Sequence, residues 1–236
     1  MRGRGVVKLL AAAVLALLGA GAWIYATRWA PSRDWFPDQG IAITADAGDV
    51  QWPTAHAAGV DFAYLRATAG AMGRDERFAG YWEATRKAGV KRGAWHGYSL
   101  CQSADAQANN FVAAVPREKT ALPAAILLDF TADCPARPGK ERVVEEVRLL
   151  LQVIEQQTGK RALLWVSERF DDAYGISAGF DRDLWLIGSF FRPNYGGRPW
   201  RMWQSSTIRR VNGVAGPARW AVIYPRAGDK GASSAL

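Results

Sequence analysis

Short apolar runs alternate along the chain with longer segments whose apolar residues recur at helical spacing. The runs predict strands at 40–44, 61–68, 91–99, 124–130, 161–167, 183–189, 200–206 and 219–225. The helical spacing predicts helices near 53–58, 75–88, 103–115 and 139–159, with little helix between the last strands. Ser103 has the residue type of a helix N-cap, and Gly159 is expected to end the longest helix.

Strands that are apolar along their length and alternate with helices are typical of a parallel sheet whose outer face is covered. About eight such strands close into a barrel. We therefore predict an α/β fold, a single irregular β/α (TIM-like) barrel over residues 38–226. Functional groups of such barrels lie at the carboxyl ends of the strands, where Thr68, His96, Asp129 and Ser167 fall.

The N-terminal 28 residues have the pattern of an export segment. The basic stretch "MRGRGVVK" precedes the uncharged apolar residues 9–26, and Arg28 follows them. A membrane-spanning helix needs about 17–25 such residues. Positive charge before the span predicts a cytoplasmic N-terminus and a chain exported to the periplasmic or extracytoplasmic side.

Two interpretations of this segment are compatible with the sequence: a transmembrane anchor and a cleaved signal peptide. Trp23, Ile24 and Tyr25 continue the apolar run and suit a membrane interface, which favours an uncleaved anchor. Small residues at 20–22 fit a cleavage site. We expect a linker at 29–37 and a flexible tail at 227–236.

Composition narrows the possible partners. The chain has 236 residues, 49% apolar and 22% charged, as ordered globular proteins do. Its net charge is +8, but beyond the N-terminal segment Arg and Lys are interspersed with acids, so no nucleic-acid partner is expected. A mildly cationic surface suits an anionic polymer such as a cell-wall glycan, and is equally typical of an ordinary solvated surface.

The chain has two cysteines, Cys101 and Cys134. An exported pair meets an oxidising compartment, so we predict a disulfide. Only His56 and His96 could complete a zinc site with them, and we therefore expect no metal and no organic cofactor.

A succession of motifs resembles the glycoside hydrolase family 25 lysozymes over residues 38–225. In chain order these motifs are "GIAIT", "AAGVDFAYLRATAG", "AGVKRGAWHGYSLC", "LPAAILLDF", "TGKRALLWVS" and "MWQSS". The resemblance implies an irregular β/α barrel that binds peptidoglycan, with muramidase activity as the family chemistry. It also implies that the loops carrying the cysteines flank the glycan cleft.

Most acidic positions of the family pattern are substituted. Where the family carries acids, this chain has Ala42, Ala69, Thr131 and Arg219, and Asp129 alone remains. Glycosidic cleavage needs one carboxyl group to protonate the leaving oxygen and a second group to stabilise or attack the sugar cation. Thr131, two residues beyond Asp129 on the same strand face, cannot supply that proton.

Other groups are candidates for the missing acid. Asp133 lies two residues beyond Thr131, and Asp46 or a protonated His96 could also donate. Two structural alternatives stay open: His96 as a hydrogen-bonded packing residue, and Asp129 as a partner of Arg66 or of a backbone amide.

Aromatic and polar side chains on the strands are candidates for sugar contacts, because aromatic rings stack on sugar faces. We expect about two of four tryptophans on or beside the strands, Trp95, Trp165, Trp185 and Trp203, to touch glycan. The candidate substrate-binding residues are Trp95, His96, Trp165, Trp185, Trp203 and Gln204.

Three hypotheses follow. The first is a membrane-tethered domain that binds cell-wall glycan but hydrolyses it weakly or not at all. The second is an active muramidase that uses Asp129 and a displaced acid. The third is a partner-binding module that no longer engages glycan. Because a fold does not fix a function, the resemblance alone does not choose among them.

Overall fold

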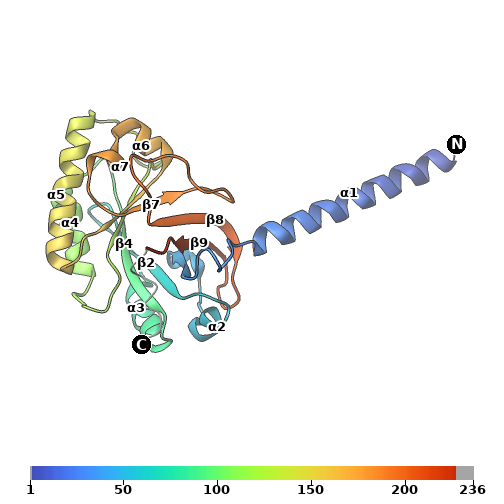
Figure 1. The fold of residues 1–236 in the computed structure, drawn as a ribbon, viewed down its shortest axis with the longest axis horizontal. Helices are drawn as coiled ribbons and strands as arrows, with labels where there is room; N and C mark the ends of the chain where they lie inside the picture. The colour runs from blue at the N-terminus through green and yellow to red at the C-terminus, as the bar shows by residue number, and fades with distance from the viewer. Residues whose placement is uncertain (1, 227–236) are drawn as a thin grey trace.

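The computed structural model describes residues 2–226 and contains a closed barrel (Figure 1). The predicted tail at 227–236 lies outside the described residues. The barrel strands are β1 (Gln39–Ile43), β2 (Phe62–Ala69), β4 (Lys91–Gly97), β5 (Ala125–Leu128), β6 (Leu163–Val166), β7 (Leu184–Ile187), β8 (Met202–Arg210) and β9 (Pro217–Ile223). They hydrogen-bond in this order, and pairing of β1 with both β2 and β9 closes the ring.

Helices follow most of the strands. They are α2 (Trp52–Ala57), α3 (Phe78–Lys87), α4 (Ala104–Ala114), α5 (Lys140–Thr158), α6 (Glu168–Tyr174) and α7 (Ile176–Gly179), with a 3-10 turn at Ala45–Ala47. The Ser103 hydroxyl accepts a hydrogen bond from the amide of Ala106 and caps α4. Gly159 ends α5 in the left-handed region, with φ 71°. The predicted barrel, cap and helix end are therefore confirmed.

Three features differ from the prediction. The short helices α6 and α7 separate β6 from β7, and β3 (Gly73–Arg74) forms a small hairpin on β2. The strand β9 is antiparallel to both of its neighbours. The connection at 211–216 is too short for the crossover that a parallel strand requires, so the chain turns back on itself.

Side chains of the barrel strands alternate between two apolar layers. The inner layer contains Tyr64, Trp95, Trp165 and Trp185, which fill the barrel. Trp165 and Trp185 stack with ring centroids 3.9 Å apart and planes 7° apart. The outer layer packs the strands against the surrounding helices, including the apolar face of α5. The barrel is thus a filled core, and its chemistry is confined to its ends.

The helix α1 (Arg2–Arg28) projects away from the barrel, on the side opposite to α5 (Figure 1). Its segment Val7–Arg28 contains an 18-residue stretch with a mean hydropathy of 2.1, none of which is buried in the protein, and Thr27 near its end is buried. At about 1.5 Å per residue this segment is long enough to cross a bilayer. Directly after α1, the ring of Trp29 contacts Phe190 and Trp203, with centroids 5.3 and 6.2 Å apart.

Candidate active site

A cavity of about 130 Å³ opens where the strands β2, β4 and β5 end. Its lining residues are Ala69, Gly70, Gly97, Tyr98, Ser99, Gln102, Leu127, Asp129, Thr131 and Asp133. It therefore lies at the end of the barrel where functional groups were expected, and it contains the retained acidic position. Among the described residues, no group of three or more His, Cys, Asp or Glu is arranged to hold a metal ion.

Asp129 follows β5 directly, and its side chain is 33% exposed. The Ser167 hydroxyl donates to its Oδ1 at 2.6 Å, and the amide of Phe130 donates to the same oxygen at 2.9 Å. The Arg169 guanidinium lies 4.0 Å away. These donors hold the Asp129 carboxylate in place as an acceptor. Asp129 therefore has a backbone amide as a partner, as one of the two structural alternatives for this residue expected. Ser167 and Arg169 follow β6, and only Ser167 was indicated by its place at a strand end.

Arg66 pairs with Asp75 rather than with Asp129. Its Nε lies 3.0 Å from Asp75 Oδ2, an oxygen that also accepts the amide of Ala45 at 2.8 Å. The Asp75 side chain is 1% exposed, so it is a buried anchor between β2 and the loop after β1. No local motif indicated Asp75, because its partners come from separate segments.

Arg219 occupies the mouth of the barrel. Because β9 is antiparallel, residue 219 near its start pairs with Ala42 near the end of β1. Its guanidinium carbon lies 5.7 Å from the ring centroids of both Trp95 and Trp165. Burial and then the neighbouring Arg66 lower the pKa of Arg219, and the charges of Asp129 and Asp46 oppose this shift. A cation therefore lies near Asp129 and Asp46 at this end of the barrel.

The candidate substitutes for the missing acid occupy different places. Asp133 lines the same cavity as Asp129 and Thr131. Asp46 is exposed in the loop after β1, where it accepts the Thr44 hydroxyl at 2.8 Å, and it does not line that cavity. Of the two, Asp133 has the more suitable position.

His96 is fully buried on the outer side of the barrel, which argues against its roles as proton donor and sugar contact. Its Nε2 lies 3.2 Å from Gln107 Oε1, and its Nδ1 lies 2.8 Å from the Thr68 hydroxyl. The Gln107 oxygen also accepts the amide of Ser99, so it acts only as an acceptor. His96 is therefore neutral, with its proton on Nε2, and burial lowers its pKa to about 4.

This histidine predicts a loss of stability in acid. An unfolded histidine takes up a proton near pH 6.5, whereas the folded His96 takes one up only near pH 4. Stability is thus full above pH 6.5 and falls as the pH decreases toward 4. We expect a loss of about 2–3 kcal/mol at pH 4.5 relative to pH 7.5 from this group.

Urea unfolding of the wild type and a His96→Gln variant at both pH values checks this expectation. The variant should lack this part of the pH dependence, while titration of the carboxylates affects both proteins alike. An identical pH dependence in the two proteins would contradict the assignment.

The tryptophans predicted to contact sugar lie below or outside the cavity. Trp165 and Trp185 have no exposed surface, and Trp95 is 3% exposed beneath Arg219. Trp203 lies in the outer layer, where its indole N–H donates to the carbonyl of Gly188 at 2.6 Å. Gln204 is buried as well, and none of these side chains lines the cavity. Their burial argues for packing roles, while Tyr98 and Gln102, which the sequence reasoning missed, do line it.

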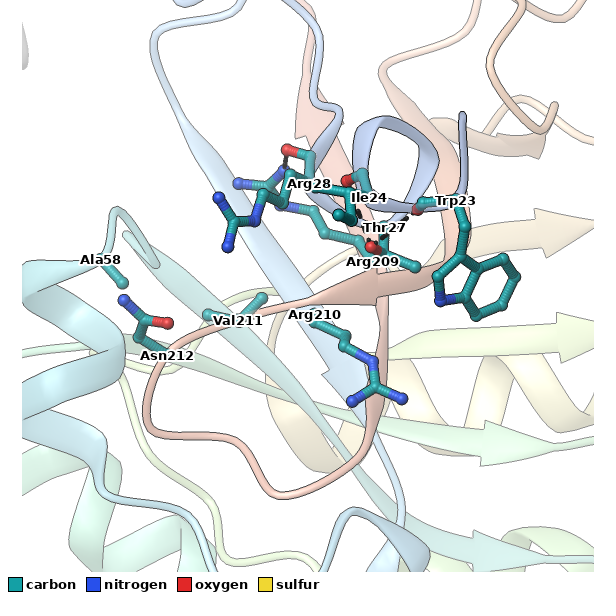
Figure 2. Close-up of a pocket in the computed structure, with 9 residues that line it drawn as sticks. All are labelled: Trp23, Ile24, Thr27, Arg28, Ala58, Arg209, Arg210, Val211 and Asn212. Carbon is teal, nitrogen blue, oxygen red and sulfur yellow. Dashed lines mark hydrogen bonds between the residues drawn. The ribbon is translucent and has the colours of Figure 1, made fainter. Parts of the chain in front are cut away.

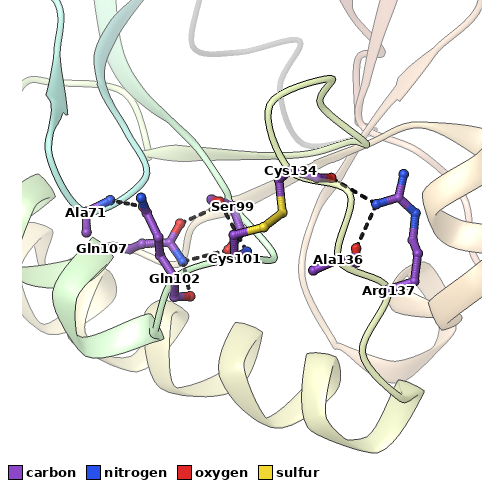
Figure 3. The surroundings of a disulfide bond; sticks show 8 residues. All are labelled: Ala71, Ser99, Cys101, Gln102, Gln107, Cys134, Ala136 and Arg137. Carbon is purple, nitrogen blue, oxygen red and sulfur yellow. Dashed lines mark hydrogen bonds between the residues drawn. A yellow bond between two sulfur atoms is a disulfide. The ribbon is translucent and has the colours of Figure 1, made fainter.

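The predicted disulfide is present (Figure 3). Cys101 and Cys134 join the loop after β4 to the loop after β5, and both loops contribute residues to the cavity. The neighbouring Gln107 amide donates to the carbonyls of Ser99 and Gln102, each at 2.9 Å. The cavity wall is thus fixed by one covalent bond and a hydrogen-bond network.

The structure is thus a closed β/α barrel with a reversed final strand and a carboxylate at the end of β5. The family described as glycosyl hydrolases family 25 matches residues 41–214. The chain therefore belongs to glycosyl hydrolase family 25.

Several known proteins are similar to this chain. The protein YegX of Escherichia coli O6:H1, described as uncharacterized, is 28% identical over 199 residues, which are 84% of this chain and 67% of YegX. A family 25 glycosyl hydrolase from Bacillus anthracis has a TM-score of 0.76 and 26% identity, covering 86% of this chain and 95% of that one. A bacterial lysozyme from Streptomyces coelicolor has a TM-score of 0.74 and 22% identity, covering 80% and 93%.

Proposed function

We propose that this protein is a lysozyme-like domain that binds cell-wall peptidoglycan on the extracytoplasmic side of a membrane and hydrolyses it weakly or not at all. The observation that carries the proposal is the composition of the barrel mouth. Thr131 shares the cavity with Asp129 at the position of the family's acid, and Arg219 adds a cation where the family has an acid. The loss of a general acid lowers a rate by about 10²–10⁴.

The cation opposes the reaction further. The transition state of glycoside hydrolysis develops positive charge on the sugar ring. A guanidinium above Trp95 and Trp165 repels that charge, whereas a carboxylate would stabilise it. Binding of the neutral sugars in the ground state is not subject to this penalty, so recognition can persist without efficient cleavage.

The active-muramidase hypothesis has one specific observation in its favour. Asp133 lines the same cavity as Asp129, so two carboxylates do face one space. The side chain of Asp133 is exposed in the loop at 131–133, whereas Thr131 stands at the position of the family's acid. The binding reading is therefore the better supported of the two.

We also propose that α1 stays attached as an anchor. The apolar segment Val7–Arg28 is followed within a few residues by contacts of Trp29 with the barrel, so little free linker separates anchor and domain. Sedimentation of the protein with carbonate-washed membranes, together with an intact mass that includes α1, tests this part.

Co-sedimentation with insoluble peptidoglycan tests binding. We expect the detergent-solubilised full chain to sediment with it, and an Ala69→Arg variant to bind at least about tenfold more weakly, a change of 1.4 kcal/mol. Ala69 is exposed and lines the cavity, so a long side chain there obstructs a glycan strand. The control is Ala79→Arg, at an exposed position of α3.

The same samples are assayed for released reducing ends. The proposal is supported if the wild type binds peptidoglycan and shows no release of reducing ends that depends on Asp129. Release that is abolished by Asp129→Ala and Asp133→Ala would establish the active muramidase instead. If the wild type does not sediment with peptidoglycan, only the partner-binding module remains.

A further inference from the structure

A second and larger pocket lies where the anchor helix meets the barrel. It has a volume of about 800 Å³ and lies between the end of α1 and the hairpin of β8 and β9 (Figure 2). Its lining residues are Trp23, Ile24, Thr27, Arg28, Ala58, Arg209, Arg210, Val211 and Asn212. The pocket thus combines apolar side chains from the membrane segment with three arginines, and no acidic residue lines it.

The arginines of this pocket lack anionic partners. Arg28 and Arg210 are exposed, and neither makes an ion pair within the described part of the chain. Arg209 is half-buried and donates from Nη1 to the carbonyl of Arg28, as Figure 2 shows. Its guanidinium carbon lies 4.3 Å from the ring centroid of Trp220, and its buried Nε has no hydrogen-bond partner.

Burial, and to a lesser extent the charge of Arg33, lower the pKa of Arg209. Both effects destabilise its charged form. Arg33 does not relieve this, because it is itself a cation and pairs with Asp61 at 2.9 Å. Figure 2 shows the guanidinium group of Arg210 directed away from those of Arg28 and Arg209, so an anion in the pocket would stabilise Arg28 and Arg209 directly and Arg210 at longer range. Guanidinium groups bind phosphate through paired hydrogen bonds, which makes a phosphate group the best-matched anion.

The position of the pocket identifies the source of that phosphate. Val7–Arg28 is the apolar segment long enough to span a bilayer, and the pocket takes its apolar wall from the last turns of this segment. Trp23 is 57% exposed and Ile24 is 51% exposed there, at the level where a bilayer changes from hydrocarbon to headgroups. A lipid could place its acyl chains along α1 and its phosphate beside Arg28 and Arg209.

We propose that this pocket binds the headgroup of an anionic phospholipid. The inference rests on the uncleaved anchor of the proposed function and goes beyond it, because it assigns the pocket a ligand. Such a lipid would fix the barrel against the membrane surface, with the arginines of β8 and α1 facing the headgroups. Electrostatic attraction to an anionic surface amounts to about tenfold in affinity for one or two arginines.

Native mass spectrometry of the detergent-solubilised full chain tests this proposal. Titration with phosphatidylglycerol and with phosphatidylcholine of the same acyl chains should show about tenfold stronger binding of the anionic lipid. The variant Arg28→Gln/Arg210→Gln should lose this preference. The control Arg86→Gln/Arg148→Gln removes the same charge from exposed positions of α3 and α5 and should retain it.

Several outcomes would overturn the proposal. They are equal binding of the two lipids by the wild type, an unchanged preference in the Arg28/Arg210 variant, and displacement of phosphatidylglycerol by an equal concentration of glycerol 3-phosphate. The last result would indicate a site for a soluble phosphate. Circular dichroism melting establishes that the variant is folded, and Arg210→Glu provides a second variant expected to lose the preference.

The result is separable from that for the proposed function. Peptidoglycan co-sedimentation of the Arg28/Arg210 variant should equal that of the wild type, because the pocket and the cavity share no lining residue. A lost lipid preference with intact glycan binding therefore bears on the pocket alone. An intact mass that lacks α1 would overturn the lipid site and the anchor together, and leave glycan binding untouched.

Discussion

Replacing Thr131 by glutamate and Arg219 by aspartate is expected to increase peptidoglycan hydrolysis by about 10²-fold or more. The glutamate would place a carboxyl group in the cavity beside Asp129. Asp129 and residue 131 line the same cavity, which lets both groups reach one glycosidic bond. The aspartate would replace the cation of the mouth by an anion opposite Ala42. The release of reducing ends from purified cell walls measures the effect.

The matched control is Thr131→Gln/Arg219→Asn, which has nearly the same shape but supplies neither a proton nor a charge. If this amide variant were as active as the acidic one, proton supply would not limit the reaction. A wild-type rate typical of lysozymes would likewise contradict the proposal. If the acidic double variant stays inactive, adding Ala42→Asp tests whether the acid missing from β1 is also required.

Replacing both cysteines by serine is expected to lower the free energy of unfolding by about 3–4 kcal/mol on the chain-entropy model. The bond between Cys101 and Cys134 closes a loop with a sequence separation of 33 residues. Without it, the unfolded chain gains freedom, and the two loops that line the cavity lose their covalent link. Chemical denaturation of the double variant and the wild type measures the difference.

Reduction of the wild type with dithiothreitol should reproduce the effect of the double variant and should leave that variant itself unchanged. Peptidoglycan co-sedimentation of the double variant should also weaken, since Gln102 and Asp133 line the cavity from the two joined loops. An unfolding free energy equal to that of the wild type would contradict the expected stabilisation by the bond.

Much of the fold could be predicted from local patterns. The apolar runs and helical repeats gave the strands and main helices, since burial imposes those periods on the sequence. The direction of β9 was not recognised, because an apolar run reads the same in both directions. The information was in the short connection at 211–216, which excludes a crossover.

The site was harder to predict because neighbouring residues of a strand point to opposite faces. Trp95 and His96 are adjacent, so only one of them can face the interior of the barrel, and the structure places Trp95 there. The same holds for Trp203 and Gln204 on β8, of which Trp203 lies in the outer layer. A side chain at a strand end can therefore be assigned to a cleft only when it is also known which face of the strand it points to.

Burial depth is a further limit. Trp165 has the inward parity of the site residues, yet it lies one layer below them and is fully buried. The depth to which solvent enters this end of the barrel depends on the side chain that covers the layer below. Here Arg219, on β9, covers Trp165, on β6. No local motif carries that information, because the contact joins β6 to β9.

The reversal of β9 also determines where the described chain leaves the barrel. Val222 pairs with Gln39 at the start of β1, and Arg226 forms an ion pair with Asp183 just before β7 begins. Both places are at the end of the barrel away from the cavity beside Asp129. A solid support or fluorescent label joined through the C-terminal side would consequently leave the opposite rim open to a large insoluble polymer.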